Sequence, residues 1–81
     1  MKTNINNKTS IEQFVIEKVK QFRIESNVSQ ADLAYKLGVS AGFIGKVESR
    51  KFSSKYNLNH LNKLAEIFNR SPKDFLPDNK L

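Results

Sequence analysis

The residues best suited to chemistry form a short basic stretch in the middle of the chain. Positions 36–55 hold five basic side chains and one acidic side chain, Glu48, and Ser53 and Ser54 add hydroxyl donors. This arrangement offers positive charge and hydrogen-bond donors to a polyanion, whose phosphate oxygens are strong acceptors. A solvated loop with incidental charge is the alternative. The basic residues are Lys36, Lys46, Arg50, Lys51 and Lys55.

The chain as a whole has the same bias. Its 81 residues include 14 Lys or Arg and 8 Asp or Glu, a formal net charge of +6. This sign favours nucleic acid or an acidic membrane surface as partner, with ordinary solubility charge as the alternative. No apolar run is long enough to cross a membrane, and residues 1–8 lack the apolar stretch of a signal peptide. We therefore expect a soluble, cytoplasmic protein that does not enter a membrane.

No group of side chains indicates an enzyme. The chain has no cysteine, which excludes disulfides, thiolate metal sites and cysteine nucleophiles. No carboxylate pair, glycine-rich phosphate loop or nucleophile with a neighbouring base stands out. The single histidine, His60, lies off the apolar face of its expected helix, which favours a solvated surface residue over a ligand. We expect no catalysis, no metal and no cofactor.

Five short helices are expected to position the basic stretch, because helix-start signals recur whereas alternating strand patterns do not. Ser10 and Gln13 fit a capping box, Ser29, Ser40 and Asn57 are further caps, and Pro72 fits the first position of the last helix. The sequence predicts an all-α, compact five-helix domain at residues 10–77. A flexible lead-in at residues 1–9 precedes it, and a tail at residues 78–81 follows.

Two of the expected helices meet across a turn of three residues, 38–40. Ala34 is small enough for a close crossing, and Gly38 can adopt the positive φ that the turn requires. This combination is typical of a helix-turn-helix, here formed by the second and third helices over residues 30–49. The apolar seam would consist of Leu33, Leu37, Val39, Ile44 and Val47.

Over residues 15–77 the sequence resembles the phage repressor/Cro-type helix-turn-helix family, also called the xenobiotic-response-element family. The resemblance implies a lambda-repressor-like fold of five helices, sequence-specific binding to double-stranded DNA and frequent two-fold dimers. It rests on Arg23, Ser29-Gln30, Leu33-Ala34, Gly38-Val39-Ser40, Ile44, Val47-Glu48 and the ending Ser71-Pro-Lys-Asp-Phe-Leu.

In such a fold the second motif helix lies in the major groove and the first crosses the DNA backbone. Base edges would be read by Ala41, Gly42, Gly45 and Lys46, of which Lys46 can donate to guanine. The ring of Phe43 either packs at the helix rim or lies against the sugar-phosphate backbone. The predicted backbone contacts are Ser29, Gln30, Ser40, Phe43, Arg50, Lys51, Ser53, Ser54 and Lys55.

The sequence departs from the family at Ala41, Gly42 and Gly45, where members usually carry Gln, Arg, Asn or Ser. Either the glycines allow close backbone approach, or direct base readout is thin and DNA shape and phosphate contacts carry more of the selectivity. We favour the second explanation. In the fold that the resemblance implies, Glu48 lies near Arg23, and we predict an ion pair between them that fixes the recognition helix against the first helix.

The leading hypothesis is a small transcriptional regulator that represses by occluding a promoter, bound as a homodimer. An antitoxin-type autoregulator, with a toxin or another regulator as protein partner, is a close variant. The alternative class is a protein-interaction module of helix-turn-helix fold with weak or non-specific DNA binding. Phe75, Leu76 and Leu81 are candidates for a dimer interface, although Phe75 and Leu76 would equally serve to close the core.

Overall fold

Polar caps set the helix boundaries in the computed structural model, which describes residues 8–81. The side chains of Ser29, Ser40 and Asn57 each accept a backbone N–H three residues on, and they start α2 (Gln30–Leu37), α3 (Ala41–Glu48) and α4 (Leu58–Phe68). The first helix, α1 (Ser10–Glu25), has Thr9 as its cap, paired reciprocally with Glu12. The predicted Ser10–Gln13 capping box is therefore wrong, because Ser10 is already helical.

The predicted count of five helices is not confirmed, because residues 8–81 contain four α-helices. The last helical segment, η1 (Pro72–Phe75), is a single 3-10 turn, although Ser71 and Asp74 form a capping box at its start. Pro77 explains why it stops. The residue before a proline is disfavoured in helical conformation, and Leu76 is indeed extended, with φ −107° and ψ 151°.

The apolar faces of the helices meet in one core. Phe22 packs edge-on against Phe75, with ring centroids 5.4 Å apart, and Phe75 is fully buried. Phe75 therefore closes the core and is not available to a dimer interface, whereas Leu76 and Leu81 are exposed. The buried hydrophobic residues are Val15, Ile16, Val19, Phe22, Leu33, Ala34, Leu37, Ile44, Val47, Tyr56, Leu61, Leu64, Ala65 and Phe75.

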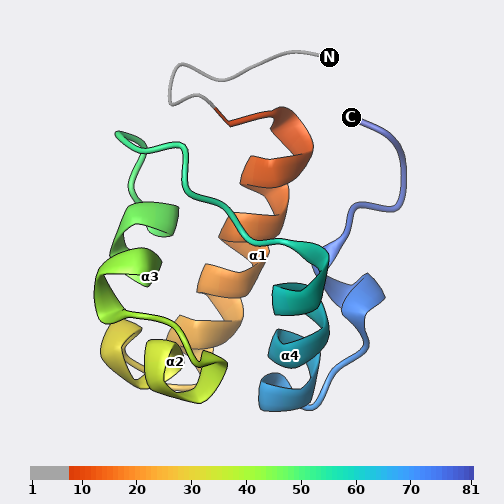
Figure 1. Cartoon of the computed structure of the whole chain (residues 1–81). Helices are drawn as coiled ribbons and strands as arrows, with labels where there is room; N and C mark the ends of the chain where they lie inside the picture. The colour runs from red at the N-terminus through yellow and green to blue at the C-terminus, as the bar shows by residue number, and fades with distance from the viewer. Residues whose placement is uncertain (1–7) are drawn as a thin grey trace.

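The helices are arranged around α1 (Figure 1). In this view α2 and α3 lie on one side of α1, and α4 and η1 lie on the other. α1 contacts α3 and η1, whereas α2 packs against both α3 and α4. The connection from α3 to α4 crosses in front of α1 in this view. Of the predicted lead-in, Lys8 and Thr9 contact the helical body, and residues 1–7 lie outside the described residues. No helix is formed in the predicted tail, residues 78–81.

Candidate nucleic-acid interface

The turn between α2 and α3 fixes how α3 is presented. Gly38 has φ +81°, a left-handed conformation that glycine adopts without steric cost. Its N–H donates to the carbonyl of Ala34 at 2.9 Å, which closes α2. Ser40 then accepts the N–H of Phe43 at 3.1 Å and opens α3. Beneath the turn, α2 and α3 share a seam of buried side chains, namely Leu33, Ala34, Leu37, Ile44 and Val47.

The face of α3 that points away from this seam carries the four residues predicted to contact bases. Ala41, Gly42 and Lys46 are exposed and Gly45 is half-buried. A Cβ added at Gly42 would meet no atom within 4 Å, and one at Gly45 would meet only the Gln30 Oε1 at 3.7 Å. Packing within the protein therefore does not require either glycine, and contact with bases stays a prediction.

An ion pair holds the end of α3 against α1. Arg23 donates from Nε to Glu48 Oε2 and from Nη2 to Glu48 Oε1, both at 2.9 Å. The two side chains are only 12% and 4% exposed. Arg23 also donates to the carbonyl of Val28, and Gln30 donates to Glu48 Oε1, each at 2.9 Å. The pair thus joins α1, the start of α2 and the end of α3, and it engages the Gln30 side chain that we expected at a phosphate.

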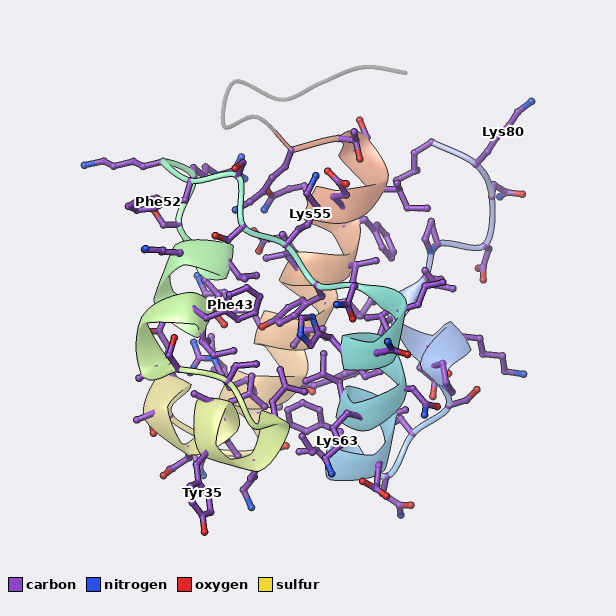
Figure 2. The ribbon with its side chains drawn as sticks, in the orientation of Figure 1. Tyr35, Phe43, Phe52, Lys55, Lys63 and Lys80 are labelled. Carbon is purple, nitrogen blue, oxygen red and sulfur yellow. The ribbon has the colours of Figure 1, made fainter. Side chains whose placement is uncertain are left out.

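The connection after α3 carries the basic residues. Arg50, Lys51, Ser53 and Lys55 are exposed and Ser54 is half-buried. The Lys55 Nζ lies 3.0 Å from Glu12 Oε2, in the stretch that passes in front of α1 in Figure 2.

Glu12 is held in its charged form at that place. The N–H of Thr9, and then the Lys55 ammonium, keep the pKa of Glu12 below its ordinary value despite its partial burial. The Lys55 charge is therefore shared with an acid of the protein itself, which leaves Arg50 and Lys51 as the more available cations of this stretch for a phosphate.

Phe43 packs at the rim of α3. Its ring centroid lies 5.4 Å from that of His60 and 6.3 Å from that of Tyr56, and Figure 2 shows it directed from α3 toward α4. Of the two placements considered for Phe43, the structure contains the rim packing, and a contact with the DNA backbone stays a prediction.

The expectation that His60 is a solvated surface residue is wrong. His60 is half-buried, and its Nδ1 accepts the N–H of Asn57 at 3.0 Å as part of the cap of α4. Burial lowers the pKa of His60. Its role in the described structure is to hold the start of α4 and to contact Phe43.

Three further residues, which the sequence did not single out, shape this region. Lys8 is buried and donates to carbonyls at the end of α3. Phe52 is exposed, and the Lys46 ammonium lies 5.5 Å from its ring centroid, a cation–π distance. Tyr56 is buried, its hydroxyl has no hydrogen-bond partner, and burial raises its pKa. In the sequence, each of these residues is only a single aromatic or basic residue in a polar segment that shows no helical or strand periodicity.

Other kinds of site find no support in the part of the chain that the structure describes. Within residues 8–81 no three His, Asp or Glu side chains are grouped so that they would hold a metal ion. None of the helices there combines the length and the apolar character that a membrane span needs.

Comparison with known protein families also identifies a helix-turn-helix. A family model of the Cro/C1-type helix-turn-helix DNA-binding domain matches residues 18–80. A search of curated protein sequences finds no significant match.

Three solved structures share the fold. The restriction-modification controller protein C.AhdI from Aeromonas hydrophila aligns with a TM-score of 0.66 and 22% identity, covering 78% of this chain and 92% of that one. A hypothetical transcription factor, NHTF from Neisseria, aligns with a TM-score of 0.71 and 17% identity, covering 95% and 84%. The SinR protein/SinI protein complex aligns with a TM-score of 0.65 and 25% identity, covering 79% of this chain and 61% of that one.

Proposed function

The chain belongs to the Cro/C1-type helix-turn-helix DNA-binding domain family, and we propose that it binds specific sequences of double-stranded DNA as a small transcriptional regulator. One observation carries the proposal: three elements adjoin to form one surface. The Gln30 Oε1 at the start of α2 lies 3.7 Å from where a Cβ added to Gly45 on α3 would stand. Lys46 on α3 lies over Phe52 in the basic connection. We call the α2 start, the exposed face of α3 and residues 50–55 the α3 surface.

On this surface base readout and backbone binding are divided. Lys46 reaches guanine O6 or N7, and the methyl group of Ala41 contacts thymine, whereas Gly42 and Gly45 offer only main chain. With one long reader, selectivity depends strongly on DNA shape. Hydroxyl, amide, aromatic and basic groups around it contact phosphates and sugars. This backbone set comprises Ser29, Gln30, Ser40, Phe43, Arg50, Lys51, Ser53, Ser54 and Lys55.

We propose that the protein acts as a homodimer that represses by occluding a promoter. An open groove of about 410 Å³ lies between the start of α1 and the start of α4. Leu58 on its rim is 81% exposed, and Ile11 and Leu76 are also exposed. Apolar side chains this accessible favour contact with a second copy. A two-fold dimer would place its half-sites roughly 34 Å apart, one turn of the DNA helix.

A protein-interaction module of the same fold is the second candidate. Tyr35 on α2 favours it, because its side chain is 89% exposed and points away from the body in Figure 2. SinR is seen in complex with another protein, SinI. By analogy, a toxin or another regulator would bind this chain, and repression of its own operon as an antitoxin belongs to the same proposal.

Selection from a library of random DNA duplexes tests the leading proposal. We expect the wild-type protein to enrich a pseudo-palindromic site with half-sites one helical turn apart. Recovery of a library no different from its input would contradict sequence-specific binding and would favour the interaction module.

Two lysine variants then test the division of roles. Lys46→Ala should narrow the difference in affinity between the selected site and a scrambled site, because it removes a base reader. Lys51→Ala should weaken binding to both sites by the same factor, because phosphates carry no sequence information. If the two variants behave alike, the assignment of Lys46 to bases is wrong.

A further inference from the structure

Lys8 is the most deeply buried charged side chain among residues 8–81. It is 1% exposed, although it precedes α1 and lies outside the helix-turn-helix. Its Nζ donates to the carbonyl of Val47 at 2.6 Å and to the carbonyl of Ser49 at 2.8 Å. Both acceptors lie at the end of the recognition helix α3, 39 and 41 residues further along the chain.

The contact of Lys8 takes the place of the C-terminal hydrogen bonds with which the other α-helices end. α1, α2 and α4 each end at or near a residue with positive φ, namely Asn27, Gly38 and Asn69. The N–H that follows each of these residues turns back to a carbonyl of the last turn, which satisfies groups that a helix end leaves unpaired.

α3 has no such ending. Its C-cap, Ser49, is extended, with φ −86° and ψ 140°, and the chain leaves the helix directly. The N–H of Ser49 donates to the carbonyls of Gly45 and Lys46, and therefore not to the carbonyl of Val47. An ammonium suits this place, because it has three donors and because the C-terminal end of a helix carries partial negative charge.

Residues 9–12, which follow Lys8, also hold the far end of the basic connection. Glu12 accepts the N–H of Thr9 at 2.9 Å and binds the Lys55 ammonium at 3.0 Å. Lys8 therefore holds the connection where it leaves α3, and Glu12 holds it before it enters α4. The path of residues 50–55 is thus fixed at both ends by residues 8–12.

Burying the Lys8 ammonium costs the free energy of its hydration. Desolvation, and then the nearby Arg50 charge, lower the pKa of Lys8, whereas Glu12 and Glu17 raise it. An apolar side chain would fill the space without that cost, but it would leave the carbonyls of Val47 and Ser49 without this donor.

We propose that Lys8 is a positioning residue for DNA binding: its ammonium caps the carbonyl end of α3 and sets the path of residues 50–55 toward the phosphates. The inference rests on the proposed DNA-binding function. Lys8 itself contacts no DNA, because its side chain is enclosed by the protein.

The test compares Lys8→Met with wild type on the duplex selected by the wild-type protein. Lys8→Met keeps the length of the side chain and removes its donors. We expect affinity for that duplex to fall about tenfold, the equivalent of one charge-assisted hydrogen bond. We expect the slope of log affinity against log salt to stay at the wild-type value, because Lys8 contacts no phosphate itself and residues 50–55 make the same phosphate contacts once bound, after paying the cost of being ordered. Lys51→Ala, by contrast, should make that slope less steep by about 0.9 per subunit.

The control is Lys63→Met, which removes one charge from a half-exposed side chain on α4 that pairs with Glu66. It should leave affinity within about twofold of wild type, since the effect of net charge alone on a screened surface is small. Lys8→Met with wild-type affinity, or with a reduced salt slope, would overturn the proposal.

A measurement on the wild-type protein covers the case in which Lys8→Met does not fold. The Lys8 ammonium should give an NMR signal that exchanges slowly with water and shows coupling across its hydrogen bonds to the two carbonyls. A fast-exchanging ammonium would overturn the cap. If instead the wild-type protein selects no duplex while this signal is present, the proposed function fails and the cap stands.

Discussion

Alanine in place of Gly45 should stabilise the protein. Gly45 lies inside the eight-residue helix α3, and Gly38 is the one glycine of residues 8–81 with positive φ. An added Cβ would meet only the Gln30 Oε1, at an ordinary contact distance of 3.7 Å. Because glycine costs a helix interior about 1 kcal/mol relative to alanine, we expect the free energy of unfolding to rise by about 0.5–1 kcal/mol. For a domain of this size the midpoint temperature should rise by roughly 2–8 °C.

Thermal and urea unfolding followed by circular dichroism measure this change, with Gly38→Ala as the matched control. At φ +81° an alanine is strained, and Gly38→Ala should lower stability by about 1–2 kcal/mol. A lower midpoint for Gly45→Ala would refute the reasoning, because it would mean that α3 has no room for the methyl group.

The same variant separates the two explanations of the α3 glycines. If affinity for the selected DNA site falls while stability rises, the glycine serves close approach of the main chain to DNA. If affinity is unchanged, position 45 takes no part in readout, and DNA shape carries the selectivity there.

Three further predictions concern the supports of the α3 surface. Arg23→Ala should lower the free energy of unfolding by about 3 kcal/mol, because it leaves a buried carboxylate unpaired, and it should weaken DNA binding as well; weaker binding at an unchanged midpoint temperature would show that the pair is not structural. Tyr56→Phe should leave stability unchanged or raise it by up to about 1 kcal/mol, because it removes a buried hydroxyl without a partner; a clear loss in urea unfolding would contradict this. The pKa of His60 is lowered in the folded protein, so the unfolded chain takes up the proton first as pH falls below about 6.5. The free energy of unfolding should therefore fall between pH 7 and pH 5, and it should fall less in His60→Gln, which keeps an acceptor for the helix cap. Parallel curves of stability against pH for the two proteins would argue against this role of His60.

Local signals account for most of the helix boundaries. A hydroxyl or amide side chain before an apolar period has a partner within three residues, so Ser29, Ser40 and Asn57 were identifiable as caps. The turn at Gly38 is local in the same sense. At the start of α1 the carboxylate of Glu12 pairs with Thr9, and a charged acceptor makes a stronger hydrogen bond than the amide of Gln13 would make at Ser10. The start of α1 was therefore misplaced by one residue.

Contacts distant in sequence are a different matter. The expected pair of Arg23 and Glu48 is present across 25 residues, but family resemblance and not residue pattern suggested it. Nothing similar pointed to Lys8, because its acceptors are main-chain carbonyls, which every residue possesses. The capping role of His60 is not predicted, because His60 occupies the capping-box position where Glu or Gln is usual.

The central claim is that the α3 surface binds DNA through its basic connection, and the salt dependence of binding tests it most directly. Each neutralised phosphate contributes about −0.9 to the slope of log affinity against log salt. The two more available cations per subunit, Arg50 and Lys51, predict a slope of about −1.8 for one subunit and about twice that for a dimer. Lys51→Ala should make the slope less steep by about 0.9 per subunit. A flat slope, or one that Lys51→Ala leaves unchanged, would contradict the claim.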